Sequence, residues 1–339
     1  MSDAAGERRS LGAVVRFGLG LPVGLAIAVG VGYLVGARPA DVARYAAGVS
    51  PWLILGCVAS SFMVLALQSL RWHSVMRPLL GLRYGQAYRA QLVGFMFNAM
   101  LPARGGDLLR VQYLGRRTGK SRATILGTEV VDRWLDWWGW IPTFLVLSVV
   151  SHPPFWLYKA LGVFGSALAA WALVMLVLTR RGFVPREGSR LGRVWAALQT
   201  GIQAFRSPRT RAIAFLLAPL PWLWESFVIS LAANVFGIHI DWIVAFSVMI
   251  GFNLAMVVPS PGAIGSVEAG GTAALIFFGV DQSRALAFMF VYHMSQLLPG
   301  VLGGVLLLIV EKEWLAGRGS RDVLRSDSEI TRSGSPAPP

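Results

Sequence analysis

A short charged stretch interrupts an apolar part of the chain at residues 98–110. It reads NAMLPARGGDLLR and lies between the apolar runs AQLVGFMF and DRWLDWWGWIPTFLVLSVV. Pro102 and the Gly105–Gly106 pair predict a broken helix, because proline removes a helical hydrogen bond and glycine loosens the backbone. A helix restarting here directs free N–H groups and its positive end at the break. With Arg104 alongside, the break predicts an anion site, most simply for a phosphate.

The residues that we expect to bind this phosphate are Arg104, Gly105, Gly106 and Arg110. Asp107 and Arg110 are three residues apart, so a helix would also pair them. The simpler alternative is that the two arginines only neutralise Asp107 and extend toward the cytoplasmic face of a membrane. Both readings stay open on the residues alone.

A second charged stretch, EVVDRWLDWW, spans residues 129–138. Glu129, Asp132, Arg133 and Asp136 fall on one helical face at three- and four-residue steps, with Glu129 and Arg133 in the favourable order. Each charge on a membrane helix costs roughly 2.5–3.5 kcal/mol, so these groups must face each other, water or a ligand. A solvated start of an interfacial helix is the alternative.

A second break, VVPSPGAIGS, interrupts the apolar stretch 242–279. Pro259 and Pro261 fix the turn, Gly262 and Gly265 permit close approach, and Glu268 falls on the first helical turn that follows. The alternative role for Glu268 is to counter the helix dipole. Glu225, within PWLWESFVIS, has no charged neighbour in sequence and is a candidate proton carrier or arginine partner.

We therefore predict one polar cavity with the hairpin breaks at its centre. The predicted cavity residues are Asn98, Asp107, Asp132, Arg133, Asp136, Glu225, Asn253 and Glu268, and the predicted break residues are Pro102, Pro259, Pro261, Gly262 and Gly265. No zinc-type His or Cys spacing and no nucleophile-elbow motif occurs, so we expect no metal, no cofactor and no catalytic residue.

The composition is that of a membrane protein. Of 339 residues, 55% are hydrophobic and 14% are charged, against roughly a quarter charged in soluble domains. The net charge of +14 comes from arginines that flank apolar spans. It therefore indicates topology and contacts with anionic headgroups rather than nucleic acid. The single cysteine, Cys57, lies in an apolar run and cannot form an intrachain disulfide.

Six full membrane spans are expected, with two re-entrant hairpins between them. The spans are 14–36, 52–70, 131–150, 156–178, 212–236 and 285–310, and the hairpins are 87–115 and 242–279. The connections between spans differ in charge: those at 71–89, 116–122 and 179–211 are rich in arginine, whereas 151–155 has no arginine or lysine. Because arginine-rich loops stay in the cytoplasm, this difference predicts that both termini are cytoplasmic. Non-helical backbone is stable at membrane depth only where it is buried in protein or lines a water-filled cavity.

This orientation predicts an inverted repeat in an all-α polytopic protein. The expected units are an N-terminal span and external loop (1–51), a first repeat (52–150), a linking span and basic loop (151–211), a second repeat (212–310), and a polar disordered tail (311–339). The first hairpin enters from the cytoplasm and the second from outside. Broken helices at matching positions of an inverted repeat indicate a transporter site at the repeat interface. A chance likeness of two Gly/Pro-rich breaks is the alternative.

The motifs NAMLPARGGDLLRVQYL, EVVDRWLDWW and VPSPGAIGSVEAG resemble those of the lysylphosphatidylglycerol synthase transmembrane family, also called the flippase-like domain family. The resemblance covers nearly all of residues 10–312. It implies an integral membrane protein that handles anionic lipids, by flipping an aminoacylated phospholipid or by serving polyprenyl-linked glycolipid pathways. Lysyl-transferring members add a large soluble catalytic domain, and the present chain ends soon after its last expected span.

We expect a lipid translocase of the cell membrane, not an enzyme, that moves an anionic phospholipid or a polyprenyl-phosphate-linked lipid. One alternative is a membrane-embedded lipid-modifying enzyme, for which Glu225 and His293 are the only loose candidates. The other is a non-transporting partner subunit of a glycosyltransferase. Glycine pairs such as Gly300 and Gly304 allow close helix packing within or between chains, so a homo-oligomer stays open.

Overall fold

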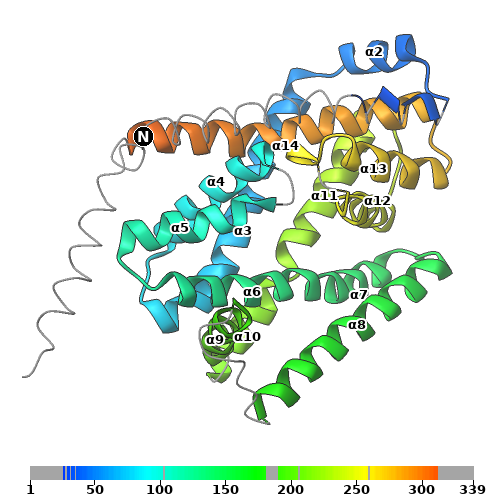
Figure 1. Cartoon of the computed structure of the whole chain (residues 1–339). Coiled ribbons are helices and arrows are strands. Elements are labelled where there is room, and N and C mark those ends of the chain that lie inside the picture. The colour runs from blue at the N-terminus through cyan, green and yellow to red at the C-terminus, as the bar shows by residue number, and fades with distance from the viewer. Residues whose placement is uncertain are drawn as a thin grey trace, which may run out of the picture.

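The computed structural model describes residues 26–311, apart from residues 27–28, 31, 35, 102–103, 181–189, 205–206 and 259. Every regular element in these ranges is a helix (Figure 1). They are α2 (Pro39–Ala47), α3 (Pro51–Leu80), α4 (Tyr84–Met100), α5 (Gly106–Thr118), α6 (Arg122–Trp138), α7 (Trp140–Val150), α8 (Phe155–Arg180), α9 (Arg190–Gln203), α10 (Pro208–Leu217), α11 (Leu220–Val235), α12 (Trp242–Ala255), the 3-10 turn η3 (Pro261–Ala263), α13 (Ser266–Phe277) and α14 (Gln282–Val310).

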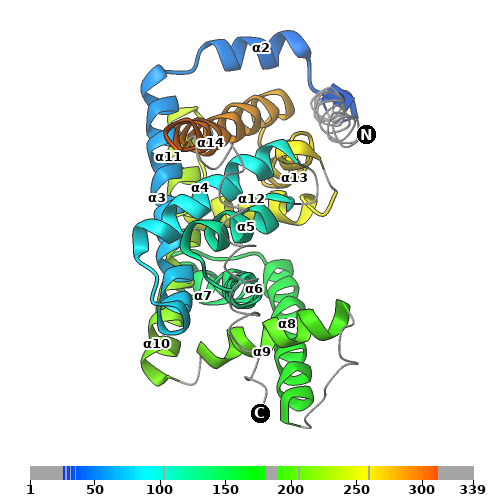
Figure 2. The same ribbon diagram turned by 60° about the vertical axis from the view of Figure 1, so that its left-hand side comes forward.

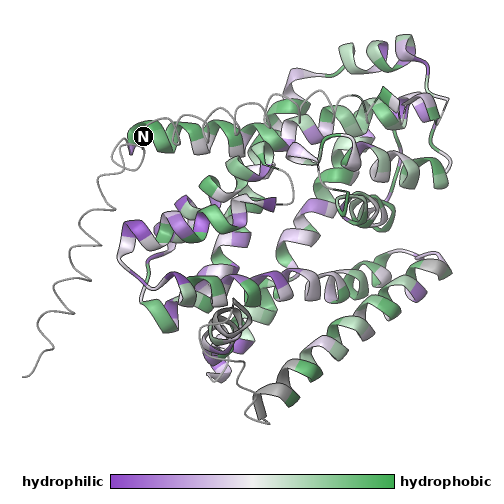
Figure 3. Ribbon diagram, in the orientation of Figure 1, coloured by the Kyte–Doolittle hydropathy of each residue, from purple (hydrophilic) through white to green (hydrophobic). Residues whose placement is uncertain are grey.

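Four segments of the described residues are long and apolar enough to cross a membrane. They are Pro51–Leu80, Leu157–Val174, Pro208–Val235 and Gln282–Val310, and they match four of the six expected spans. Figure 3 shows hydrophobic colour over α8 and α14, whereas hydrophilic colour gathers on α5 and the first part of α6. The chain is therefore a multi-pass membrane protein. Most of the expected span 14–36, and nearly all of the expected tail, lie outside the described residues.

The expected span 131–150 is not one uninterrupted helix. α6 ends at Trp138 and α7 begins at Trp140, with Gly139 between them in helical conformation. Pro142 has no N–H to donate to the carbonyl of Trp138, which ends the regular ladder there. A side chain on Gly139 would collide with the backbone of Ala218, so the junction is also where α10 and α11 approach closely.

The segment that we expected to be a loop at 71–89 is mostly helical. α3 continues past residue 70 to Leu80 and ends at Gly81, which has a positive φ of 66°. α4 then starts at Tyr84, where the backbone N–H of Arg83 donates to the Gln86 side chain at 2.8 Å. Arg71 therefore belongs to the membrane helix and not to a cytoplasmic loop.

Both expected breaks separate two packed helices. α4 packs against α5, and α12 packs against α13. In the second hairpin the backbones approach closely, because a Cβ on Gly251 would lie 2.9 Å from the carbonyl oxygen of Gly270. Figure 2 shows the two hairpins between α14 and the α6–α7 helix pair.

The helix contacts repeat between the two halves of the chain. α3 contacts α4 as α11 contacts α12, and α5 contacts α6 as α13 contacts α14. Across the halves, α4 contacts α14 and α12 contacts α7. The contact between α4 and η3 also brings the first break to the second.

Candidate functional site

A cavity of about 220 Å³ lies between the two hairpin breaks. Its wall includes residues from α3, α4, α5, α6, α11, α12, η3 and α14. Its titratable side chains are Arg104, Asp107, Arg110, Arg133, Asp136, Glu225, Tyr292 and His293. Residues beside both breaks, among them Leu101, Arg104, Ser260 and Gly262, line this cavity.

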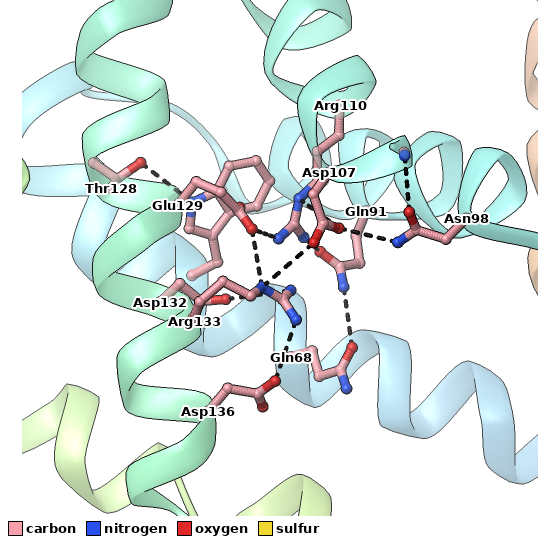
Figure 4. A network of polar contacts seen from close by, with 12 residues as sticks. Gln68, Gln91, Asn98, Asp107, Arg110, Thr128, Glu129, Asp132, Arg133 and Asp136 are labelled. Atoms are coloured by element: carbon pink, nitrogen blue, oxygen red, sulfur yellow. Dashed lines mark hydrogen bonds and ion pairs between the residues drawn. The ribbon is translucent and has the colours of Figure 1, made fainter. Parts of the chain in front are cut away.

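Asn98 closes the first break. Its side-chain oxygen accepts the Gly106 N–H at 2.8 Å, and its amide nitrogen donates to Asp107 at 3.0 Å (Figure 4). A Cβ on Gly106 would collide with the carbonyl oxygen of Gly94, which explains why α5 starts with glycine. The Gly106 N–H is thus held by Asn98. Neither Gly105 nor Gly106 lines the cavity, so the predicted phosphate contact from these backbone groups lacks support.

Arg110 is buried, and its guanidinium bonds to other side chains of the protein. Its guanidinium donates to Gln91 and Glu129 and lies 4.6 Å from the centre of the Trp72 ring. A cation over an aromatic face gains electrostatic attraction. Gln91 in turn donates to Gln68 on α3 at 3.0 Å. Arg110 therefore ties α5 to α6, α4 and α3, in addition to forming part of the cavity wall.

Arg71 is a site residue that the sequence analysis missed. It is fully buried, and its guanidinium pairs with Asp132 at 2.8 and 3.2 Å and with Asp136 at 2.6 Å. Asp132 faces Arg71 and does not line the cavity, which corrects its predicted position. Two features of the sequence could have indicated this pairing. Arg71 directly follows the apolar run 52–70, and residues 129–136 contain three acids but only one arginine.

Arg133 connects the rest of this charged cluster. It contacts Glu129 at 3.0 Å, Asp136 at 3.2 Å and, at a longer 4.0 Å, Asp107 on α5 (Figure 4). Its side chain is 24% exposed, so it reaches the cavity while the carboxylates behind it are buried. The alternative of a solvated interfacial helix start does not fit these buried pairs.

The cluster needs one further cation. Arg71, Arg110 and Arg133 face Asp107, Glu129, Asp132 and Asp136, so three positive charges meet four negative ones. Arg104 supplies the fourth positive charge from the cavity wall, but no ion pair or hydrogen bond joins its side chain to another described residue. Arg104 is exposed and has a positive φ of 54°, rare for a residue with a side chain.

The second break is held by Glu268. One carboxylate oxygen accepts the Gly265 N–H at 2.6 Å and the other lies 2.8 Å from His293 Nδ1. Glu268 is fully buried and does not line the cavity, so its predicted place there is wrong. Its hydrogen bond to Gly265 matches the alternative role at the helix start. His293 carries the polar surface to the cavity instead.

Backbone conformation explains the glycines of this break. Gly262 and Gly265 have φ values of 61° and 86°, which residues with side chains rarely adopt. Pro261 begins the η3 turn. Pro102 and Pro259 lie outside the described residues. Asn253 lines the cavity and donates to the Met249 carbonyl at 2.9 Å.

Glu225 faces the cavity from α11. Its oxygen Oε1 accepts from the Tyr292 hydroxyl at 2.5 Å and from the Gln296 amide at 3.4 Å. No arginine, lysine or histidine of the described chain lies within ion-pair distance of it. The described residues also contain no cluster of three metal-ligating side chains.

The comparisons agree with the transmembrane character of the site. A family model described as "Lysylphosphatidylglycerol synthase TM region" matches residues 22–304. This range includes both hairpins and every residue that lines the cavity. No curated protein sequence matches the chain.

Proposed function

The chain belongs to the lysylphosphatidylglycerol synthase transmembrane family, and from this premise we propose that it is a lipid translocase. The lipid carries a phosphate, as an anionic phospholipid or a polyprenyl-phosphate-linked lipid. The single observation that carries the proposal is the free Arg104 guanidinium on the wall of a cavity bordered by both breaks. A headgroup crossing a roughly 30 Å apolar layer needs such a polar surface.

In this proposal Arg104 binds the phosphate with its planar pair of N–H donors. Asp107, Arg110 and Arg133 fix the first break, so the guanidinium of Arg104 stays directed at the cavity. Arg110 acts as a positioning residue, because its two terminal nitrogens donate to Gln91 and Glu129. The acyl or polyprenyl chains remain outside, along the apolar helix faces.

We also propose that the two hairpins are re-entrant and dip from opposite faces of the cell membrane. Both termini are then cytoplasmic, with residues 151–155 and 237–241 external. In a cysteine-free background, a Lys120→Cys variant should react only with reagents that enter the cell, and His152→Cys should react with impermeant ones. The reverse labelling of these two positions would overturn the orientation.

The test of function is lipid movement in vesicles that contain the purified protein. Fluorescently labelled phosphatidylglycerol is followed by quenching from outside. Arg104→Gln should slow movement about tenfold to a hundredfold, since hydrogen bonds to charged groups contribute roughly 1.5–3 kcal/mol. Arg104→Lys should restore part of the rate, because an ammonium loses the two-pronged contact. Arg44→Gln, a change at an exposed residue of α2, is the control.

The other outcomes separate the remaining functions. Normal movement in Arg104→Gln at normal folding would put the phosphate site elsewhere. No movement in the wild type, together with normal cell growth when the break charges are neutralised, would favour a non-transporting subunit of a glycosyltransferase. Chemical conversion of the added lipid in detergent would favour a lipid-modifying enzyme.

A further inference from the structure

Glu225 differs from every other carboxylate around the cavity. Asp107, Asp136 and the buried acids behind them have arginine partners, and Glu268 has His293. Glu225 has only hydrogen-bond donors from α14, the Tyr292 hydroxyl and the Gln296 amide. Both donate to Oε1, so Oε2 receives no hydrogen bond from the described residues.

The difference matters because the other charges around the cavity balance without Glu225. The four arginines Arg71, Arg104, Arg110 and Arg133 match Asp107, Glu129, Asp132 and Asp136 in number. Ionised Glu225 therefore adds a negative charge that no cation of the described residues offsets. An arriving lipid phosphate adds a second negative charge to the same cavity.

Resting on the proposed function, we propose that Glu225 is a proton-binding site and that its proton enters the cavity together with the lipid phosphate. The proton attaches to a carboxylate oxygen of Glu225 and leaves it when the phosphate departs. Lipid and proton then move together through the same cycle.

The physical basis is linkage between two ligands. A phosphate anion binds less well beside a carboxylate than beside a neutral carboxyl group, since like charges repel. Thermodynamic reciprocity then requires that a bound phosphate favours proton uptake by the same factor. Coupling between sites is typically about 5- to 150-fold. The Tyr292 and Gln296 donors hold the carboxyl group in place in both protonation states.

Other titratable groups line the same cavity or lie near Glu225, and the experiment must distinguish their titration from that of Glu225. They are Cys57 on α3, Tyr292 and His293 on α14, Arg133 and Asp136 on α6, Asp107 and Arg110 on α5, and Arg104 at the first break. α7, and the cavity-lining part of α12, contribute no titratable side chain. His293 is the important competitor, because its imidazole lines the same cavity and lies 2.8 Å from the Glu268 carboxylate.

The experiment measures proton uptake during lipid binding. Water-soluble dihexanoyl phosphatidylglycerol is added to the purified protein in weak buffer with a pH-sensitive dye. Its phosphodiester keeps one negative charge across the range from pH 5.5 to 8. The wild type should take up protons on binding and bind about tenfold more tightly at pH 5.5 than at pH 8. Glu225→Gln should bind equally at both pH values without proton uptake, and His293→Gln should retain the uptake.

Each contrary result has one meaning. Binding by the wild type without proton uptake, or uptake that persists in Glu225→Gln, overturns the proton site and leaves lipid translocation standing. If proton uptake is lost only in His293→Gln, the proton binds to His293 and the proposal for Glu225 is overturned. Dihexanoyl phosphatidylethanolamine brings its own ammonium. If Glu225→Gln weakens only this lipid, Glu225 is a headgroup contact and the inference is overturned. Wild-type binding no tighter than in Arg104→Gln rejects the proposed function and the inference together.

Discussion

At the scale of single residues, Arg71 stabilises the buried carboxylates of α6 in the folded protein. Among the described residues, it is the only ion-pair partner of Asp132 closer than 3.9 Å, and it shares Asp136 with Arg133. Arg71→Met leaves buried carboxylates without their cation, a change that typically costs about 3–5 kcal/mol. We expect a large drop in thermal stability in detergent and a low yield of folded protein.

The matched control for this prediction is an exposed ion pair. Arg44 pairs with Asp41 on α2, where the arginine side chain is 75% exposed. Arg44→Met should change stability by less than about 1 kcal/mol, since exposed pairs contribute little. Equal effects of Arg44→Met and Arg71→Met would show that the buried pairs do not stabilise the fold.

The sequence alone identified most charged residues of the site but not their partners. The face formed by Glu129, Arg133 and Asp136 follows from helical spacing, and the structure retains it. Arg71 was assigned to a topology signal, because an arginine at the end of an apolar run looks like a cytoplasmic flank. Only tertiary packing distinguishes a flanking arginine from one that is turned inward toward α6.

At the scale of elements, the α12–α13 hairpin depends on glycine at its contact. A Cβ on Gly270 would collide with the carbonyl oxygen of Gly251 and lie 2.7 Å from the Ala255 side chain. Gly270→Ala should therefore lower stability by about 1–3 kcal/mol, the usual cost of overpacking. The second hairpin should open, and lipid movement should fall with it.

Gly162 on α8 provides the control, because nothing lies within 4 Å of a Cβ built there. Gly162→Ala should be neutral or stabilising by up to about 1 kcal/mol, since alanine favours helix. Thermal melts of both variants in the same detergent give the comparison. A neutral Gly270→Ala would mean that the hairpin helices can separate without loss.

Element ends were harder to derive than the elements themselves. The proline and glycine breaks marked where α4 gives way to α5 and where α12 gives way to α13. The end of α3 was set ten residues too early, at residue 70 instead of Leu80, because Arg71 and His73 resemble a membrane boundary. The junction at Gly139 was missed, although Pro142 carries the signal for it.

At the scale of the whole molecule, the two breaks meet at one place. The Ala99 carbonyl oxygen lies 3.2 Å from where a Cβ on Gly262 would be, and α4 contacts η3. Ala99→Cys with Ala263→Cys, in a Cys57→Ala background, should crosslink with a short bifunctional reagent. The crosslink should stop lipid movement, and reducing it should restore movement.

Each cysteine variant alone, treated with the same reagent, is the control for chemical modification. Lipid movement that continues in the fully crosslinked double variant would show that the breaks need not separate. The meeting of the breaks was predicted from their likeness in sequence. The position of Glu268 was not, because both helix capping and cavity lining suit an acid on a first turn.

The Arg71–Asp132 pair also has a consequence for how the chain is made. Its two members are 61 residues apart, and a ribosome adds roughly 5–20 residues per second. α3 therefore leaves the ribosome several seconds before its acidic partner exists, with an arginine that costs roughly 2.5–3.5 kcal/mol in lipid. We expect the nascent α3 to wait beside the insertion machinery until α6 arrives. In a Cys57→Ala background, a Ser69→Cys label should react in chains arrested before Glu129 and be protected in finished ones, whereas equal protection in both would contradict this delay. The buried charges would then set the order in which the helices enter the bilayer, and a variant could fail during synthesis although its finished form is stable.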